Sequence, residues 1–196
     1  MSINRFDPRG LLVGPLLHFR RNDLAIAGGK GANLGELAQA GFDVPPGFII
    51  TTAAYDLFVQ SNAVQTRLAE MFAFFNSDNP DSLKEVSQQI RSLLQRATIP
   101  GQITDQALTA YRELGGGAVA VRSSATAEDL PEAAFAGQQE TFLNIVGEQA
   151  LMAAVHACWM SLWSERAILY RSRQNTDQAT VKLAVVVQRM VPADVA

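Results

Sequence analysis

Apolar residues along this chain follow two patterns: short continuous runs, and positions spaced three or four apart. Continuous runs bounded by turn residues are typical of buried strands. They predict strands within residues 11–19, 48–50, 118–122, 141–146 and 182–191. The last run is rich in valine, so we expect its strand to be buried.

Helical spacing of apolar residues predicts helices in the remaining stretches. The spaced positions are Leu34, Leu37 and Ala38 up to Gly41; Val64, Leu68, Met71, Phe72 and Phe75 up to Asn79; Val86, Ile90, Leu93 and Leu94; Ala107, Leu108, Tyr111 and Leu114; and Leu151, Val155, Cys158, Trp159 and Leu162, continuing to about Arg173. Thr51 or Thr52, and a capping box of Ser82 and Glu85, are the expected helix starts. The expected fold class is therefore α/β, in the sense of mixed α+β, with a mainly helical segment at 53–114.

Composition limits the kinds of partner. The 196 residues are 48% hydrophobic, which suits one or two small domains with a core of their own. The net charge of −3 argues against nucleic acid or a membrane surface as a partner, but a nucleotide needs only a few local cations. Cys158 is the only cysteine, which excludes an intrachain disulfide and favours a cytoplasmic setting. No apolar run approaches the ~20 residues that span a bilayer.

Two motifs carry the candidate chemistry. An apolar run ends on Arg122 and is followed by two serines, and a glycine-rich segment around Lys30 lies much earlier in the chain. One cation at a strand end and a second at a glycine-rich helix start suit a polyphosphate. The segment is not a Walker A loop, because Gly31 follows the lysine where serine or threonine is required. It is not a Rossmann fingerprint either, because its third glycine, Gly35, falls one position late.

Each motif also has an ordinary structural interpretation. Lys30 would be a solvated lysine beside a glycine turn, and Arg122 would pair with Glu128 or Asp129. The residues alone favour neither interpretation of Lys30 and slightly favour the ion pair for Arg122. Glu128, Asp129 and Glu132 are more simply a solvated acidic loop than metal ligands.

The two motifs, in this order, resemble the N-terminal ATP-binding domain of the phosphoenolpyruvate synthase and pyruvate phosphate dikinase family, which also includes the rifampicin phosphotransferases. The resembling segments are residues 27–52, 118–146, 161–171 and 182–196. Residues 122–144 are most similar to the synthase and rifampicin branches. The resemblance implies an ATP-grasp-like nucleotide-binding fold, of which residues 1–196 are a truncated N-terminal portion.

The resemblance also implies a set of site residues. Lys30 and Arg122 would brace the ATP phosphates and act in catalysis. The implied nucleotide contacts add Gly29, Ser123, Gly137, Gln138, Gln139, Thr141, Gln188 and Met190. Residues 134–141 would close as a lid over the phosphates, and Gln188 and Met190 would lie near the base. The pattern of residues 182–191 suits a core strand with outward polar residues equally well.

The activity implied by the resemblance is phosphoryl transfer. ATP and Mg²⁺ are the expected cofactors, with the main metal ligands outside this chain. The phosphoryl group would pass to a histidine on another domain and then to pyruvate, or to an antibiotic such as rifampicin. His18 and His156 both lack the phosphohistidine context. A different class, a non-catalytic nucleotide-binding or scaffold domain, stays open.

The expected partners are the second half of the ATP-binding domain and the phosphohistidine domain. This chain alone is then expected to fold but to be inactive. It should also leave an exposed apolar face along residues 185–191.

Overall fold

A computed structural model describes residues 10–73, 75–126 and 140–192, and the strands in this part form one sheet. The strands are β1 (Val13–Pro15), β2 (Gly47–Ile50), β3 (Val119–Ala125), β4 (Thr141–Ile145) and β5 (Leu183–Arg189). Their order across the sheet is β1-β2-β5-β3-β4, and every neighbouring pair is antiparallel. The mixed helix-and-sheet class predicted from the sequence is therefore confirmed.

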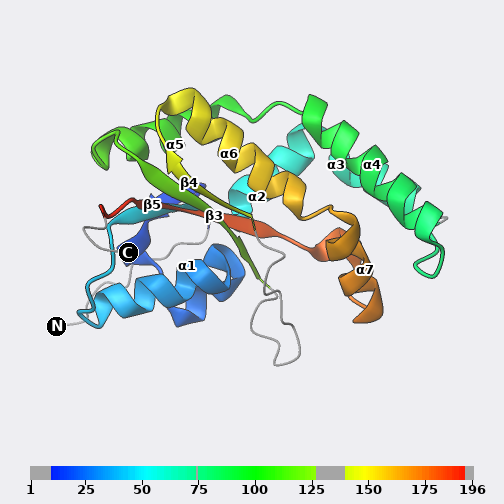
Figure 1. Ribbon diagram of the computed structural model, residues 1–196, viewed down its shortest axis with the longest axis horizontal. Helices are drawn as coiled ribbons and strands as arrows, with labels where there is room; N and C mark the ends of the chain where they lie inside the picture. Colours follow the sequence, from blue (N-terminus) through cyan, green and yellow to red (C-terminus); the bar gives the residue numbers. More distant parts are fainter. Residues whose placement is uncertain (1–9, 74, 127–139, 193–196) are drawn as a thin grey trace.

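Helices cover both faces of the sheet, as Figure 1 shows. Helix α1 (Leu24–Gln39) lies on one face with two short 3₁₀ turns, Leu16–His18 and Arg21–Asp23. The opposite layer consists of α2 (Thr52–Ser61), α3 (Val64–Phe72), α4 (Pro80–Arg96), α5 (Gly101–Glu113), α6 (Glu148–Ser161) and α7 (Glu165–Arg173). A third 3₁₀ turn, Gln178–Thr180, precedes β5. Within the described residues, no helix is both long and apolar enough to cross a bilayer.

Strand β5 lies in the middle of the sheet and contributes to a core on each side. Because side chains alternate along a strand, Val185 and Val187 join the large core beneath α2 and α6, and Val186 joins a smaller core beneath α1. All three valines are fully buried. The expected exposed apolar face along 185–191 is therefore wrong, because α1 packs on one face of this strand and α2 and α6 pack on the other. Only Val191, beyond the strand end, is largely exposed.

The predicted strands are found, with two changes of extent. Strand β3 runs to Ala125, three residues past Arg122, because Ser123 and Ser124 continue the pairing with β5. Arg122 therefore lies within the strand instead of ending it. In the stretch 11–19 only Val13–Pro15 are a strand, and the chain then turns into a 3₁₀ helix at Leu16.

Helix boundaries differ more from the predictions. The apolar stripe that begins at Val64 belongs to a separate helix, because Ala63 adopts a left-handed conformation with φ 51°. The stripe that begins at Leu151 also spans two helices, α6 and α7, and Ser164 caps the second one. Apolar spacing continues through both breaks, so the pattern alone does not reveal them.

Helix starts were only partly predicted. The side chain of Asn79 caps α4 by accepting hydrogen bonds from the amides of Asp81 and Ser82, so the predicted Ser82–Glu85 capping box is wrong. Thr51 occupies the N-cap position of α2, but its hydroxyl donates to the carbonyl of Leu11 instead of capping the helix. The buried face of α4 does include Val86, Ile90 and Leu94, as expected.

Helix α1 packs on the sheet through its small residues. Its buried positions include Ala27, Gly31, Ala32 and Gly35, whereas Leu37 is exposed. A Cβ atom on Gly35 would lie 2.3 Å from the carbonyl oxygen of Phe19, so the helix approaches its neighbours more closely than any larger residue would permit. Of the apolar positions that predicted this helix, Leu34 packs against the small core, whereas Leu37 points to solvent.

Candidate nucleotide-binding site

The glycine-rich segment is a kinked helix start. Gly28 adopts φ 68° and ψ 173°, which divides α1 into a short first turn and a longer second part. Residues Gly29 to Gly31 already belong to that second part, so the tight loop predicted at 28–31 reduces to one residue. A Cβ atom on Gly28 would lie 2.1 Å from the Ser124 carbonyl oxygen, and only glycine adopts this backbone region readily.

Strand β3 holds the kink through Ser124. Its hydroxyl donates to the carbonyl of Ala27 at 2.9 Å and accepts from the amide of Gly31 at 3.1 Å. The ammonium of Lys30 donates to the carbonyl of Ser123 at 3.0 Å. Two motifs more than 90 positions apart therefore meet at one joint between α1 and β3.

Arg122 lies on the face of the sheet that α1 covers. It is opposite Val186 on β5 and Thr141 on β4, and directly opposite residues of antiparallel strands share a face. Arg122 is half-buried and Thr141 is exposed. No hydrogen bond or ion pair of the Arg122 guanidinium is found among the described residues. Glu128 and Asp129, its alternative partners, lie outside them.

Ser123 has a different environment from Arg122. It is buried, its amide donates to the carbonyl of Glu140 at 3.1 Å, and its hydroxyl donates to the same oxygen at 3.3 Å. Gly29 is also buried, in the first turn after the kink. The structure thus brings Gly29, Lys30, Arg122, Ser123 and Thr141 together, whereas Gly137, Gln138, Gln139 and most of the expected lid lie outside the described residues.

Gln188 and Met190 lie at the other end of β5. Met190 lies four residues beyond Val186, the residue opposite Arg122, which corresponds to roughly 13 Å along the strand at about 3.3 Å per residue. Gln188 is buried, and its amide donates to the carbonyl of Pro45 at 3.0 Å. Met190 is half-buried and its backbone amide donates to the carbonyl of Ala118. The side chain of Gln188 thus holds the turn before β2.

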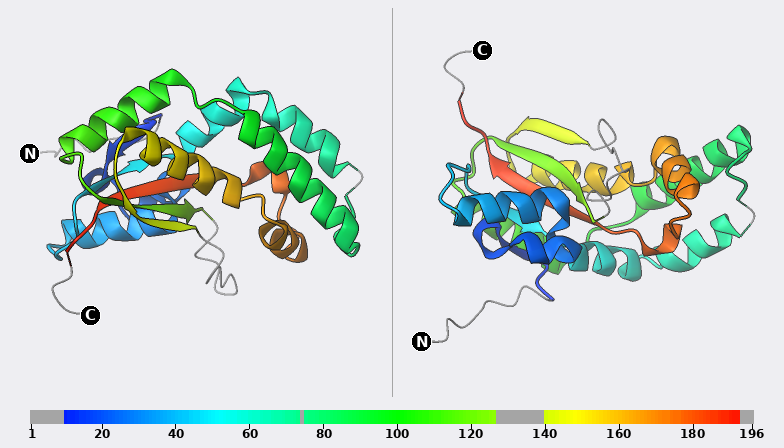
Figure 2. Two further views of the ribbon diagram at one scale, coloured as in Figure 1. Left: turned by 45° about the horizontal axis from the view of Figure 1, so that its top comes forward. Right: turned by 90° about the horizontal axis from the view of Figure 1, so that it is seen from below.

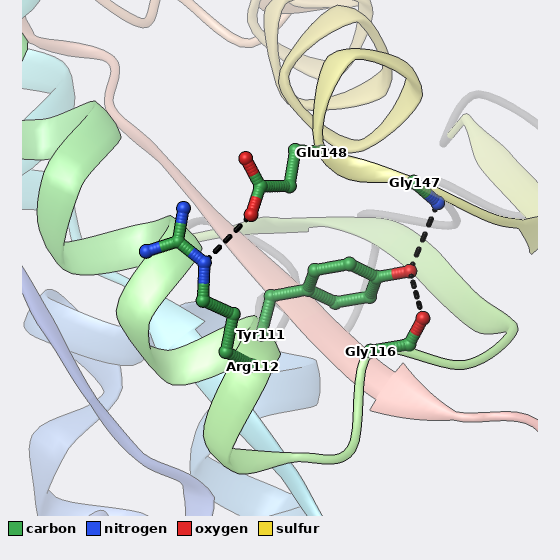
Figure 3. A network of polar contacts seen from close by, with 5 residues as sticks. All are labelled: Tyr111, Arg112, Gly116, Gly147 and Glu148. Carbon is green, nitrogen blue, oxygen red and sulfur yellow. Dashed lines mark hydrogen bonds and ion pairs between the residues drawn. The ribbon is translucent and has the colours of Figure 1, made fainter.

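A polar network near the Met190 end joins two turns of the chain (Figure 3). The Tyr111 hydroxyl lies 2.8 Å and 2.9 Å from the carbonyls of Gly116 and Gly117, and it accepts from the amide of Gly147 at 2.9 Å. Beside it, Arg112 pairs with Glu148 at 2.6 Å, and this hydrogen bond raises the pKa of Arg112. The network ties the turn before β3 to the turn before α6. Sequence reasoning missed this network, because Tyr111 was predicted only as an apolar helix position.

Cys158 lies on α6, which packs on the opposite face of β3. Burial raises the pKa of its thiol to about 12, Glu140 contributes in the same direction, and Lys30 opposes both. The charges of Lys30 and Glu140, both at the candidate site, therefore influence the pKa of this buried thiol. Cys158 is thus a core residue, and the half-buried His156 packs against Phe58 and contacts the Leu94 carbonyl.

A groove of about 470 Å³ elsewhere on the molecule is unsuited to a polyphosphate. It lies between α5 and strands β1 and β2, and its lining includes the carboxylates of Asp105 and Glu113. Like charges would repel phosphate there. The cationic residues of the α1–β3 joint are the better candidates.

Comparisons with known proteins identify the family of the chain. The family model of the pyruvate phosphate dikinase AMP/ATP-binding domain matches residues 24–196. The chain belongs to this family. It is 46% identical to a probable phosphoenolpyruvate synthase of Methanothermobacter thermautotrophicus, over 89% of the chain and 26% of the relative. It is 44% identical to the phosphoenolpyruvate synthase of Aeropyrum pernix, over 86% and 21% of the two chains.

A relative with another printed activity is also similar. The chain is 39% identical to the rifampicin phosphotransferase of Bacillus subtilis, over 92% of the chain and 21% of that protein. The chain spans about a quarter or less of the length of these three relatives. The resemblance found in the sequence is confirmed, including its second branch.

The described residues do not form a magnesium site of their own. Among the described residues, no group of three or more histidine, cysteine, aspartate or glutamate side chains could hold a metal ion. Glu140 is the acidic residue next to Ser123 and is exposed. One carboxylate does not form an all-protein Mg²⁺ site, although Mg²⁺ in nucleotide sites often keeps waters and substrate oxygens as ligands.

Proposed function

We propose that this chain is the N-terminal part of an ATP-grasp-like nucleotide-binding domain and that it holds the ATP phosphates at the α1–β3 joint. The observation that carries the proposal is the hydrogen bond of the Lys30 ammonium to the carbonyl of Ser123. It places one cation of the glycine-rich motif beside Arg122, in a chain whose family is an AMP/ATP-binding domain.

The two cations suit different parts of a triphosphate. The planar guanidinium of Arg122 can donate to two oxygens at once, whereas the Lys30 ammonium acts as a compact point charge. The second part of α1 starts just beyond Gly28 and adds the positive end of a helix dipole. Together these groups would offset the charge that moves between oxygens during phosphoryl transfer.

The base would lie toward Met190, with the nucleotide running along β3 and β5. Gln188 would act there through the turn that it holds, because its amide is bonded to the Pro45 carbonyl. Residues 134–141, with Gly137, Gln138 and Gln139, would close over the phosphates. Thr141, opposite Arg122, supports this placement of the closing segment.

In the full enzyme, we propose that ATP phosphorylates a histidine on another domain, which then phosphorylates pyruvate. The synthase names of the relatives support pyruvate as the acceptor, and the Bacillus subtilis relative supports rifampicin as a second candidate. Mg²⁺ would be bound by ligands outside this chain, and the enzyme would be cytoplasmic.

The test is ATP affinity in three variants, measured by amide chemical-shift titration, which reaches millimolar dissociation constants. Lys30→Ala and Arg122→Ala should each raise the Kd about tenfold or more, or about 1.4 kcal/mol, because each removes a charged phosphate contact. Lys182→Ala is the control, since the Lys182 ammonium pairs with Asp56 on α2. ATP affinity unchanged in both site variants would refute the proposal.

A further inference from the structure

We infer that Ser124 is a positioning residue that fixes the Lys30 ammonium at the nucleotide site. The inference rests on the proposed function, because it concerns how the phosphate-binding lysine is placed. Ser124 itself is not expected to contact the nucleotide: it is fully buried and its hydroxyl is engaged on both sides.

The two hydrogen bonds of Ser124 reach both sides of the kink in α1. Its hydroxyl donates to Ala27, the last residue before Gly28, and accepts from Gly31, the residue after Lys30. Residues 27 and 31 are thereby held to one oxygen atom of β3. The backbone of Lys30 lies between these two points and has little freedom to shift along the strand.

The same stretch of β3 also receives the end of the lysine side chain. The Lys30 ammonium donates to the carbonyl of Ser123, the residue just before Ser124. A lysine side chain has a flexible four-carbon stem, so the position of its ammonium depends on where its backbone is held. Ser124 supplies that hold. Gly28 permits it, because a Cβ atom at position 28 would lie 2.4 Å from the Ser124 hydroxyl oxygen.

A purely structural role would give a different result from a positioning role, and Ser87 provides the comparison. Ser87 is also a buried serine, and its hydroxyl donates to the Trp163 carbonyl at 2.8 Å between α4 and the end of α6. Ser87→Ala removes a buried hydrogen bond far from α1. It should lower thermal stability, as Ser124→Ala should, without altering ATP affinity.

The experiment is a double-mutant cycle on ATP affinity with Ser124→Ala, Lys30→Ala and the double variant. Ser124→Ala should raise the Kd for ATP about tenfold. In the Lys30→Ala background the same substitution should change the Kd by less than about twofold, because the effect acts through Lys30. Ser124→Cys, which replaces the hydroxyl by a larger thiol that forms only weak hydrogen bonds, replaces Ser124→Ala if that variant does not fold.

The outcomes distinguish the proposed function from the positioning role of Ser124. An ATP affinity insensitive to both Lys30→Ala and Arg122→Ala would refute the proposed function, and insensitivity to Lys30→Ala alone would overturn the inference about Ser124. An affinity that depends on Lys30 but not on Ser124, or an equal Ser124 effect with and without Lys30, would overturn the positioning role. A crystal structure of the nucleotide-free Ser124→Ala variant gives an independent readout. The Lys30 ammonium should leave the Ser123 carbonyl, and its persistence there at 3.0 Å would also overturn the inference.

Discussion

At the scale of single residues, Gly28 and Ser124 determine how the glycine-rich motif meets the sheet. Gly28 has a backbone conformation that side chains disfavour, and it also lies against Ser124. Gly116 has a similar φ of 64°, but nothing lies within 4 Å of the Cβ atom it would carry. The pair therefore compares a positive-φ glycine packed against the sheet with one in open space.

We predict that Gly28→Ala destabilises the fold far more than Gly116→Ala. The second substitution should cost about 1 kcal/mol, from the positive φ alone. The first adds overlap with the backbone of β3 and should cost about 3 kcal/mol or more. Urea unfolding monitored by tryptophan fluorescence measures both values. Equal costs would show that the contact between Gly28 and Ser124 does not constrain the fold.

Cys158 makes a prediction about pH. Its thiol pKa is raised from 9.0 to about 12 in the folded chain, so the unfolded chain loses this proton first as pH rises. The contribution to stability is complete below pH 9 and is lost between pH 9 and about 12, at up to about 1.4 kcal/mol per pH unit. Between pH 8 and 11, wild type should therefore lose more stability than Cys158→Ala. Parallel pH profiles of the two proteins would contradict this.

At the scale of elements, the ends of helices and strands are set by local contacts that hydrophobic periodicity does not contain. The cap of α4 is an example. Asn79 accepts two backbone hydrogen bonds at the start of the helix, and Pro80 takes the first helical position. The hydroxyl of Ser82, by contrast, accepts from the amide of Asn76 in the preceding turn.

We predict that Asn79→Ala lowers the free energy of unfolding by about 1 kcal/mol, the usual cost of losing an N-cap. Ser82→Ala should cost less than about 0.5 kcal/mol, because its one exposed hydrogen bond is easily replaced by water. Denaturant unfolding of the two variants is the measurement. A larger loss in Ser82→Ala than in Asn79→Ala would restore the Ser82 capping box.

The elements themselves could be predicted from the sequence, but some of their faces and partners could not. Apolar runs located β2, β4 and β5, and glycines marked the ends of α1 and α5. Part of the buried face of α1 was missed because small residues, which periodicity ignores, permit the closest approach. The central place of β5 was missed because strand order is a property of the whole sheet.

At the scale of the whole molecule, one antiparallel sheet separates a large helical layer from α1, as the left view in Figure 2 shows. The candidate site lies where α1 meets β3, on the face opposite the large core. The sequence predicted that Lys30 and Arg122 belong to one site, because their motifs match the family. It did not predict Ser124 as the contact that joins them, since a buried serine has no signature in sequence.

The most direct test is a crystal structure of this chain with a non-hydrolysable ATP analogue bound. The account predicts phosphate oxygens at hydrogen-bonding distance, about 3 Å, from both the Lys30 ammonium and the Arg122 guanidinium. It also predicts that the helix start after Gly28 faces the triphosphate. Phosphates bound elsewhere, with neither cation in contact, would contradict the account.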